Sequence, residues 1–240
     1  MSTPIGIRSN NLIIKTMANV ILIMGQSGSG KSTAIRTLKP EETAIFNVLG
    51  KRLPFKGART VYNEESKNLF NISDYGQIYS YLQGISQNRP ERKNIIIDDA
   101  TYLMRNEMFA RAKENGYAKF TDMAQHFQQL LVLAQSLRED MNIFLVMHSE
   151  AVNNGGDIDT YKVATVGKML DEKYNPMECV SICLYCDVKF DESGKPIHGF
   201  YTNVVNAAGK RIPAKSPEGM FESDFIPNDL QMVVDAINNY

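Results

Sequence analysis

The amino-acid sequence predicts an α/β fold in which a mainly parallel sheet is covered by helices on both faces. Short apolar runs alternate along the chain with longer stretches whose apolar residues recur at helical spacing, which is typical of such a sheet. Three apolar runs, residues 19–24, 94–100 and 142–148, end at or just before glycine or ionisable side chains. Ligands of open parallel sheets bind beyond the carboxyl ends of the strands, so we expect these three ends to form one site.

The first half of the chain has clear helix boundaries. The helix after the first run is expected to end before Pro40, because the residue before a proline is usually not helical. Ser73 or Asp74 is placed to cap a later helix. Up to residue 101 we expect, in order, an edge strand at 11–16, a strand at 19–24, a helix at 33–38, a strand at 43–49, an irregular polar segment at 51–67, a helix at 73–87 and a strand at 94–100.

The second half begins with a long helical region that Gly116 is expected to break. Segment 151–167 is polar and contains glycine, which predicts a loop. From residue 102 onward we expect a helical region at 102–141, a strand at 142–148, a loop at 151–167, strands at 179–190 and 198–203 around a turn at 192–195, and an amphipathic helix at 227–238.

Length and charge limit the class of protein. The 240 residues are expected to form a single domain, with residues 1–16 as an N-terminal extension. The net charge of −1 argues against a strongly basic surface overall, although it does not describe local patches. No apolar run approaches the ~20 residues that span a bilayer, and the N-terminus lacks the pattern of a secretory signal. We therefore expect a cytoplasmic protein with no membrane partner.

A phosphate-binding loop follows the first strand. Residues 25–32 read Gly-Gln-Ser-Gly-Ser-Gly-Lys-Ser and match G-x-x-x-x-G-K-S between a predicted strand and a predicted helix. Glycines allow the tight turn whose amides hold an anion, the lysine reaches the β- and γ-phosphates, and the serine hydroxyl ligates Mg²⁺. The expected ligands are ATP and Mg²⁺. The predicted nucleotide-binding residues are Gly25, Gln26, Ser27, Gly28, Ser29, Gly30, Lys31, Ser32 and Thr33.

Two carboxylates end the second of the three runs. The β-branched residues 95–97 are typical of a buried parallel strand, and Asp98 and Asp99 follow directly. A carboxylate in this position downstream of a phosphate loop is the Walker B arrangement, in which the acid helps to hold Mg²⁺. We expect Asp98 to hold the metal through water, opposite Ser32.

The cysteines have the C-x3-C-x2-C spacing of radical-SAM iron–sulfur ligands. Cys179, Cys183 and Cys186 nevertheless lie in a strand-like run, in which the first two would face one side and the third the other. Three ligands on opposite faces do not converge on one point. Buried structural cysteines are therefore expected.

Five motifs, in this order, resemble those of phage-encoded RecA-like ATP-binding proteins, a group that includes ATPases associated with single-strand annealing and recombination. The motifs are GQSGSGKS, NIIIDDA, VMHSE, VGKMLDEK and AKSPEGMF. The resemblance covers about residues 18–238, and the last two motifs are its most specific part. It implies a RecA-type core that binds ATP between neighbouring subunits of an oligomer or filament.

The resemblance also implies roles for single residues. His148 stands where a RecA-like protein places a polar sensor of the γ-phosphate. Lys215, in Ala-Lys-Ser-Pro-Glu-Gly-Met-Phe, resembles the lysine of RadA-type ATPases that reaches the γ-phosphate of the neighbouring subunit. Lys168 and Lys173 are weaker candidates for the same role.

One departure from the family concerns the acid that activates water. RecA-type proteins carry a catalytic glutamate near the end of the strand after the phosphate-loop helix, but residues 44–49 contain no acid. Asp99 is the first candidate to replace it, because it adjoins the metal aspartate, and Glu150 is the second. If neither acts, hydrolysis is slow and ATP serves mainly as a structural switch.

Single-stranded DNA is the polymer partner that the resemblance implies. RecA-like proteins contact DNA through loops after the Walker B and sensor strands, which here are residues 105–122 and 151–167. The first stretch interleaves cations with aromatic rings, as single-strand binding requires, but acidic residues dilute its charge. The cations are Arg105, Arg111, Lys113 and Lys119, the rings Phe109, Tyr117 and Phe120, and the acids Glu107, Glu114 and Asp122.

Two other functions are compatible with a phosphate loop. A small-molecule phosphotransferase would need an arginine-bearing lid, for which Arg105 and Arg111 are the nearest candidates. An ATP-gated annealing or scaffold protein would bind ATP to order its subunits without turning it over. The missing acid after Leu49 keeps this second alternative open.

Overall fold

The computed structural model describes residues 17–207 and 209–240. The predicted edge strand at 11–16 and the N-terminal extension lie outside the described residues. The strands are β1 Asn19–Gly25, β2 Thr43–Asn47, β3 Leu69–Phe70, β4 Asn94–Asp98, β5 Asn142–Asn154, β6 Asp157–Val163, β7 Ile182–Phe190, β8 Pro196–Tyr201, β9 Val205–Ala207, β10 Lys210–Ile212 and β11 Phe225–Pro227. The helices are α1 Ala58–Val61, α2 Tyr75–Asn88, α3 Thr101–Ala110, α4 Ala118–Gln135 and α5 Leu230–Asn239, with short 3-10 helices at Ser32–Thr37 and Pro176–Cys179 and a π-helical turn at Met169–Lys173.

The strands form one mixed sheet with a parallel centre. Its main path runs β11-β8-β7-β1-β5-β4-β2-β3, and every pair from β7 to β3 is parallel. The pairs β7–β8 and β8–β11 at one edge are antiparallel. The predicted α/β class with a mainly parallel sheet is therefore confirmed.

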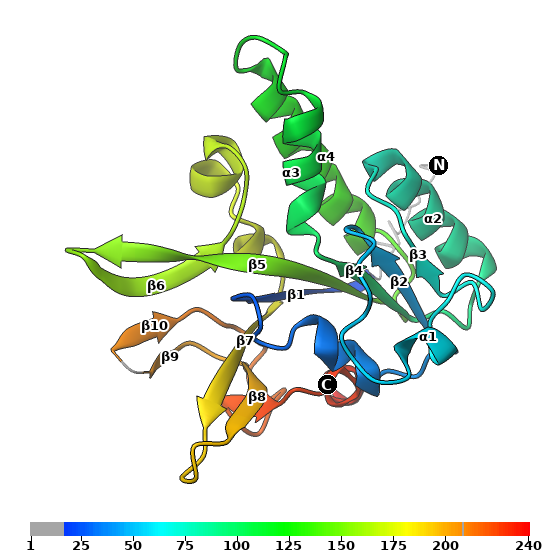
Figure 1. Ribbon diagram of the computed structural model, residues 1–240. Helices are drawn as coiled ribbons and strands as arrows, with labels where there is room; N and C mark the ends of the chain where they lie inside the picture. Colours follow the sequence, from blue (N-terminus) through cyan, green and yellow to red (C-terminus); the bar gives the residue numbers. More distant parts are fainter. Residues whose placement is uncertain (1–16, 208) are drawn as a thin grey trace, which may run out of the picture.

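Helices cover both faces of this sheet, as predicted (Figure 1). Side chains alternate along β1, so that Leu22 faces one apolar cluster and Ile23 the other. The first cluster contains α2, α3 and α4, for example Leu82 and Phe127. The second contains residues of the 3-10 helix Ser32–Thr37 and of α5, together with Tyr62 directly after α1. Because both faces of the central strands are covered, their sequences are continuously apolar rather than alternating.

Helix ends follow the predicted capping residues. Asp74, rather than Ser73, caps α2 by accepting a hydrogen bond from the amide of Gln77 at 2.9 Å. The predicted break in the long helical region is confirmed, since α3 ends before and α4 begins after Gly116, which has a φ of +85°. Among the described residues, no helix is long and apolar enough to cross a membrane.

The predicted loop at 151–167 is wrong. Strand β5 continues to Asn154 and returns as β6, so that most of this segment is an antiparallel hairpin that projects from the sheet (Figure 1). The hairpin is solvent-exposed along much of both faces, so its residues are polar and show no apolar alternation. The helix predicted at 33–38 also differs, since it is a short 3-10 helix, Ser32–Thr37.

The shortest strands were not predicted, for a different reason. Strand β3 has two residues, and β9, β10 and β11 have three residues each. Such lengths carry no recognisable period. They form because neighbouring strands offer free backbone groups for pairing.

Candidate active site

The register of the parallel strands brings the three predicted strand ends together. Gly25 at the end of β1 lies opposite His148 on β5, and Ile97 on β4 lies opposite Leu145. The amide of Ala100 donates to the carbonyl of Val146 at 2.8 Å, which holds the turn after β4 against β5. Asp98 and Asp99 therefore reach the level of the phosphate loop.

Glycine is required at separate points of the phosphate loop. A Cβ atom on Gly25 would lie 2.4 Å from the carbonyl oxygen of Cys186 on β7, so only glycine allows this close approach. Gly28 and Gly30 have φ values of +81° and +107°, which favour glycine. The loop is therefore shaped both by β7 and by its own backbone.

The side chain of Lys31 is held against the loop. Its Nζ donates to the carbonyl oxygens of Gly25 and Gln26, each at 2.8 Å. Burial lowers the pKa of Lys31, while nearby Cys186, Asp99 and Asp98 act in the opposite direction. The ammonium group lines the same cavity as Ser32 and Asp99.

Ser32 and Asp98, which are predicted to hold the metal, lie in contact with each other. The Ser32 hydroxyl donates to Asp98 Oδ1 at 2.7 Å. Burial, together with the neighbouring charge of Asp99, raises the pKa of Asp98 to about 6. A hydroxyl and a carboxylate are hard oxygen ligands of the kind that Mg²⁺ takes, with water and phosphate oxygens completing its shell. The described residues include no group of three or more His, Cys, Asp or Glu side chains that could hold a metal.

Asp99 is the most constrained acid of the site. Its φ of +58° is uncommon for a residue with a side chain. His148 Nε2 lies 3.2 Å from its Oδ1, and Lys51 Nζ lies 2.6 Å from its Oδ2. Burial tends to raise the pKa of Asp99, but the hydrogen bond from His148 and the ion pair with Lys51 outweigh this effect and lower it.

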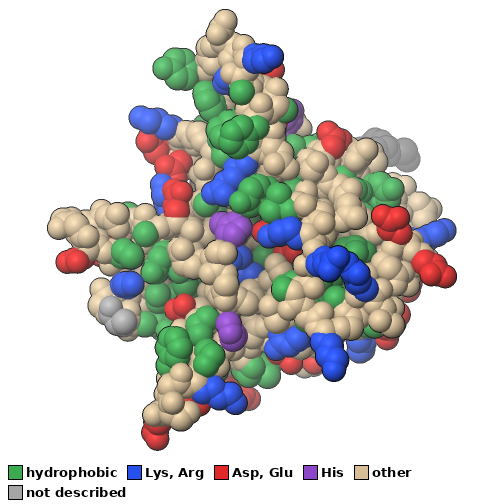
Figure 2. Space-filling view, in the orientation of Figure 1, with side chains coloured by type: hydrophobic (Ala, Val, Ile, Leu, Met, Phe, Trp, Pro, Cys, Tyr) green, Lys and Arg blue, Asp and Glu red, His purple; other side chains and the backbone are tan. Residues whose placement is uncertain are grey.

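Lys31, Ser32, Lys51, Asp99 and His148 line a cavity of about 290 Å³. Figure 2 shows the corresponding face, on which histidine side chains lie near lysine and arginine side chains. Most of the predicted nucleotide-binding residues line the cavity: Ser27, Gly28, Gly30, Lys31, Ser32 and Thr33. The other three lie around the loop: Gly25 packs against β7, Ser29 is buried, and Gln26 donates to Ser149 Oγ at 3.1 Å.

Five lining residues were not predicted because they lie outside any motif. His198 on β8 donates from Nδ1 to the carbonyl of Ser29 at 2.8 Å, and Asn228 donates to the carbonyl of Gly30 at 3.1 Å. These contacts fix the loop from the antiparallel edge of the sheet. The full set is Arg36, Lys51, Pro54, His198 and Asn228. Four of them, Lys51, Pro54, His198 and Asn228, come from three segments that no spacing in the sequence relates to the loop, whereas Arg36 lies in the 3-10 helix that follows the loop directly.

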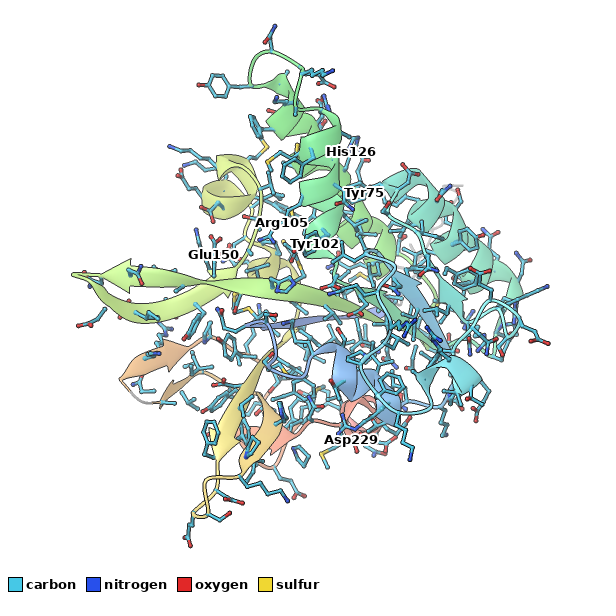
Figure 3. All side chains as sticks on the ribbon, in the orientation of Figure 1. Tyr75, Tyr102, Arg105, His126, Glu150 and Asp229 are labelled. Atoms are coloured by element: carbon cyan, nitrogen blue, oxygen red, sulfur yellow. The ribbon has the colours of Figure 1, made fainter. Side chains whose placement is uncertain are left out.

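Glu150 and Lys215 lie outside this cavity. Glu150 is on the projecting part of β5, where its carboxylate lies 3.1 Å from Lys162 of β6 (Figure 3). Lys215 pairs through its backbone with Cys183. Lys168 and Lys173 are exposed beside the π-helical turn. A role for Lys215, Lys168 or Lys173 in a neighbouring subunit stays a prediction.

The predicted DNA stretch 105–122 is mostly helical. It comprises most of α3, the connection at 111–117 and the beginning of α4. Arg111 is engaged by Glu107, Glu114 and Asp122, so its charge is largely compensated. Arg105 lies over the ring of Tyr102, with its Cζ 5.1 Å from the ring centroid (Figure 3). Phe109 and Tyr117 are exposed, as a stacking surface would require.

The cysteines are structural within the described part of the chain. Cys183 and Cys186 lie on β7 and belong to the two apolar clusters on opposite faces, as predicted. Cys179 is not in the strand but in the 3-10 helix before it, packed against the first cluster. Burial raises the pKa of Cys183 to about 12 and that of Cys186 to about 11.

A family comparison agrees with this geometry. The family model described as an AAA domain matches residues 17–212, which include the phosphate loop, both aspartates and His148. A search of curated proteins found no match. Since the matched region covers far more than half of the sequence, the chain belongs to this AAA-domain family of P-loop ATPases.

Proposed function

We propose that the protein binds ATP with Mg²⁺ and hydrolyses it, as a RecA-like protein that acts on single-stranded DNA in phage recombination, annealing or replication. The observation that carries the ATP part is the convergence of Lys31, Ser32 and Asp99 on one cavity, with Asp98 in contact with Ser32 beside it. The resemblance in sequence motifs carries the DNA part.

The residues divide the work of hydrolysis among them. Lys31 binds the β- and γ-phosphates, and Ser32 with Asp98 positions Mg²⁺. When bound, the metal neutralises charge that develops on the phosphates. Asp99 orients the attacking water and accepts its proton, while His148 holds the other carboxylate oxygen in place.

A chain of contacts supports coupling between the cavity and the DNA stretch. The ring of Tyr102 meets that of His148 edge-on, with centroids 5.8 Å apart, and Arg105 lies over the ring of Tyr102. Single-stranded DNA bound at Arg105 would therefore be linked through the contact with Tyr102 to His148, which contacts Asp99. This arrangement favours DNA-dependent turnover.

The first test is ATP hydrolysis with and without single-stranded DNA, beside Lys31→Ala and the control Lys39→Ala. We expect Lys31→Ala to lower ATP affinity or turnover by roughly 100-fold or more, because the variant loses the main phosphate cation. Lys39 is exposed and pairs with Glu42 outside the cavity, so its loss should change neither. Normal ATP binding and turnover by Lys31→Ala would refute the assignment of the site.

DNA dependence has its own readout. We expect binding to a labelled oligonucleotide that weakens with salt and changes with a non-hydrolysable ATP analogue. Absence of binding at low salt would refute the DNA role while leaving the ATPase intact.

A variant of Lys215 tests whether ATP is bound between neighbouring subunits. If Lys215 reaches the γ-phosphate of a neighbouring subunit, Lys215→Ala should abolish turnover and spare ATP binding. Intact turnover would refute the action in trans. ATP at a subunit interface is thus a proposal that this variant can exclude.

A second candidate function is an ATP-gated annealing protein that does not hydrolyse ATP. The observation that favours it is Asn47, which ends β2 where RecA-type proteins carry an acid, and whose amide donates to the carbonyl of Lys51 at 2.6 Å. Annealing retained in an Asp99→Asn, Glu150→Gln double variant, with ATP bound, would favour this candidate over the hydrolase.

A further inference from the structure

Lys51 is a cation that the phosphate-loop motif does not include. It follows β2 and lines the nucleotide cavity together with Gly28, Lys31 and Ser32. Its ammonium group lies 2.6 Å from Asp99 Oδ2. The Lys51 side chain is 58% exposed, whereas that of Asp99 is 5% exposed.

The backbone of Lys51 is anchored although its side chain is exposed. Its carbonyl accepts a hydrogen bond from the side-chain amide of Asn47. In the preceding turn, the backbone amide of Gly50 donates a hydrogen bond to the backbone carbonyl of Asn47 at 3.2 Å. Gly50 has a φ of +63°, which suits this turn. The backbone of Lys51 is therefore held in place, while its side chain lines the cavity and is largely exposed to solvent.

Stability alone does not account for this contact. Because the Lys51 side chain is largely exposed, water screens much of its attraction to Asp99. Asp99 already has His148 on its other oxygen. The cavity also holds cations at fixed positions, since Lys31 is tied to two carbonyl oxygens and Arg36 to Asn228.

We propose that Lys51 binds the terminal phosphate of a nucleoside triphosphate and, in doing so, leaves Asp99. The γ-phosphate is a competing anion for the exposed ammonium group, whose point charge suits phosphate. Once Lys51 has moved, one oxygen of Asp99 is free to accept a hydrogen bond from water. With a diphosphate, Lys51 stays on Asp99. The inference rests on the proposed function, because it assumes that the cavity takes a nucleotide.

The test measures affinity for a non-hydrolysable ATP analogue and for ADP, both with Mg²⁺. In Lys51→Met we expect the analogue to bind about tenfold more weakly, the effect of one charge-assisted hydrogen bond, and ADP affinity to change less than about twofold. Lys51→Arg should keep most of the preference for the triphosphate. Equal losses for both nucleotides, or no loss for either, would overturn the proposal.

A double-variant cycle distinguishes the movement of Lys51 from Asp99 to the γ-phosphate from simple repulsion between Asp99 and the nucleotide. Asp99→Asn removes the rival anion, so the analogue should bind several-fold more tightly when Lys51 is present and unchanged when Lys51 is methionine. A gain of equal size in both backgrounds would mean that the carboxylate merely repels the nucleotide, and would overturn the exchange.

The wild-type protein distinguishes the two levels of failure. If it binds neither nucleotide with Mg²⁺, the proposed function fails. If it binds the analogue in a Lys31-dependent manner while Lys51→Met retains the full preference for the triphosphate, only the role of Lys51 fails. Lys51 is exposed, so a thermal-unfolding profile like that of the wild type is expected, and it confirms that the variant is folded.

Discussion

The two halves of strand β5 differ sharply although they form one continuous strand. The inner half, residues 142–147, lies between parallel neighbours β1 and β4 and is buried throughout. The outer half, residues 149–154, pairs with β6 alone and is mostly exposed. His148 stands at the junction. The comparison teaches that apolar patterning reports burial rather than strand formation, and that the site forms where a strand leaves the buried sheet.

The largest expected difference lies in the free energy of unfolding. Phe144 is fully buried in the inner half, so Phe144→Ala should lower that free energy by about 3–5 kcal/mol through lost burial and a residual cavity. Val152 is only partly buried in the outer half, so Val152→Ala should cost less than about 1 kcal/mol. Urea unfolding of both variants checks this. Similar losses would contradict the division of β5 into a core half and a surface half.

A smaller effect is expected at the junction. The buried hydroxyl of Thr101 accepts a hydrogen bond from the amide of His148 at 2.9 Å. Thr101→Val keeps the shape but leaves that amide unpaired, which should cost about 1–3 kcal/mol. Thr101→Ser keeps the hydroxyl and loses one methyl group, about 0.8 kcal/mol. If Thr101→Ser proves the more harmful of the two by denaturation, packing rather than the hydrogen bond holds the junction.

The smallest effect is expected on the projecting hairpin. Glu150→Gln breaks an exposed pair with Lys162, which also contacts Asp171, so the free energy of unfolding should change by no more than about 1 kcal/mol. Because Glu150 lies outside the cavity, ATP turnover should stay close to that of the wild type, whereas Asp99→Asn should reduce it strongly. A turnover loss in Glu150→Gln as large as that in Asp99→Asn would make Glu150 the acid that serves catalysis.

The central architecture and the core of the site are predictable from the amino-acid sequence alone. The phosphate loop is contiguous, so its anion-binding shape depends on residues 25–32 and on the strand before them. The runs at 19–24, 94–100 and 142–148 are apolar because both faces of the sheet are covered, and this pattern was sufficient to place Asp98 and Asp99 at the end of a buried strand and His148 where the buried part of β5 ends. Parallel register then brings such ends to one edge.

The other residues of the site are known only from the folded structure. Lys51, His198 and Asn228 reach the cavity from the segment after β2, from β8 and from the start of α5, and no local pattern links them to the loop. The outer part of β5 and all of β6 form through pairing with each other, so their polar residues resemble a loop in the sequence. The physical reason is the same in both cases: local sequence encodes burial and turn geometry, whereas contacts between distant segments depend on how the completed sheet brings them together.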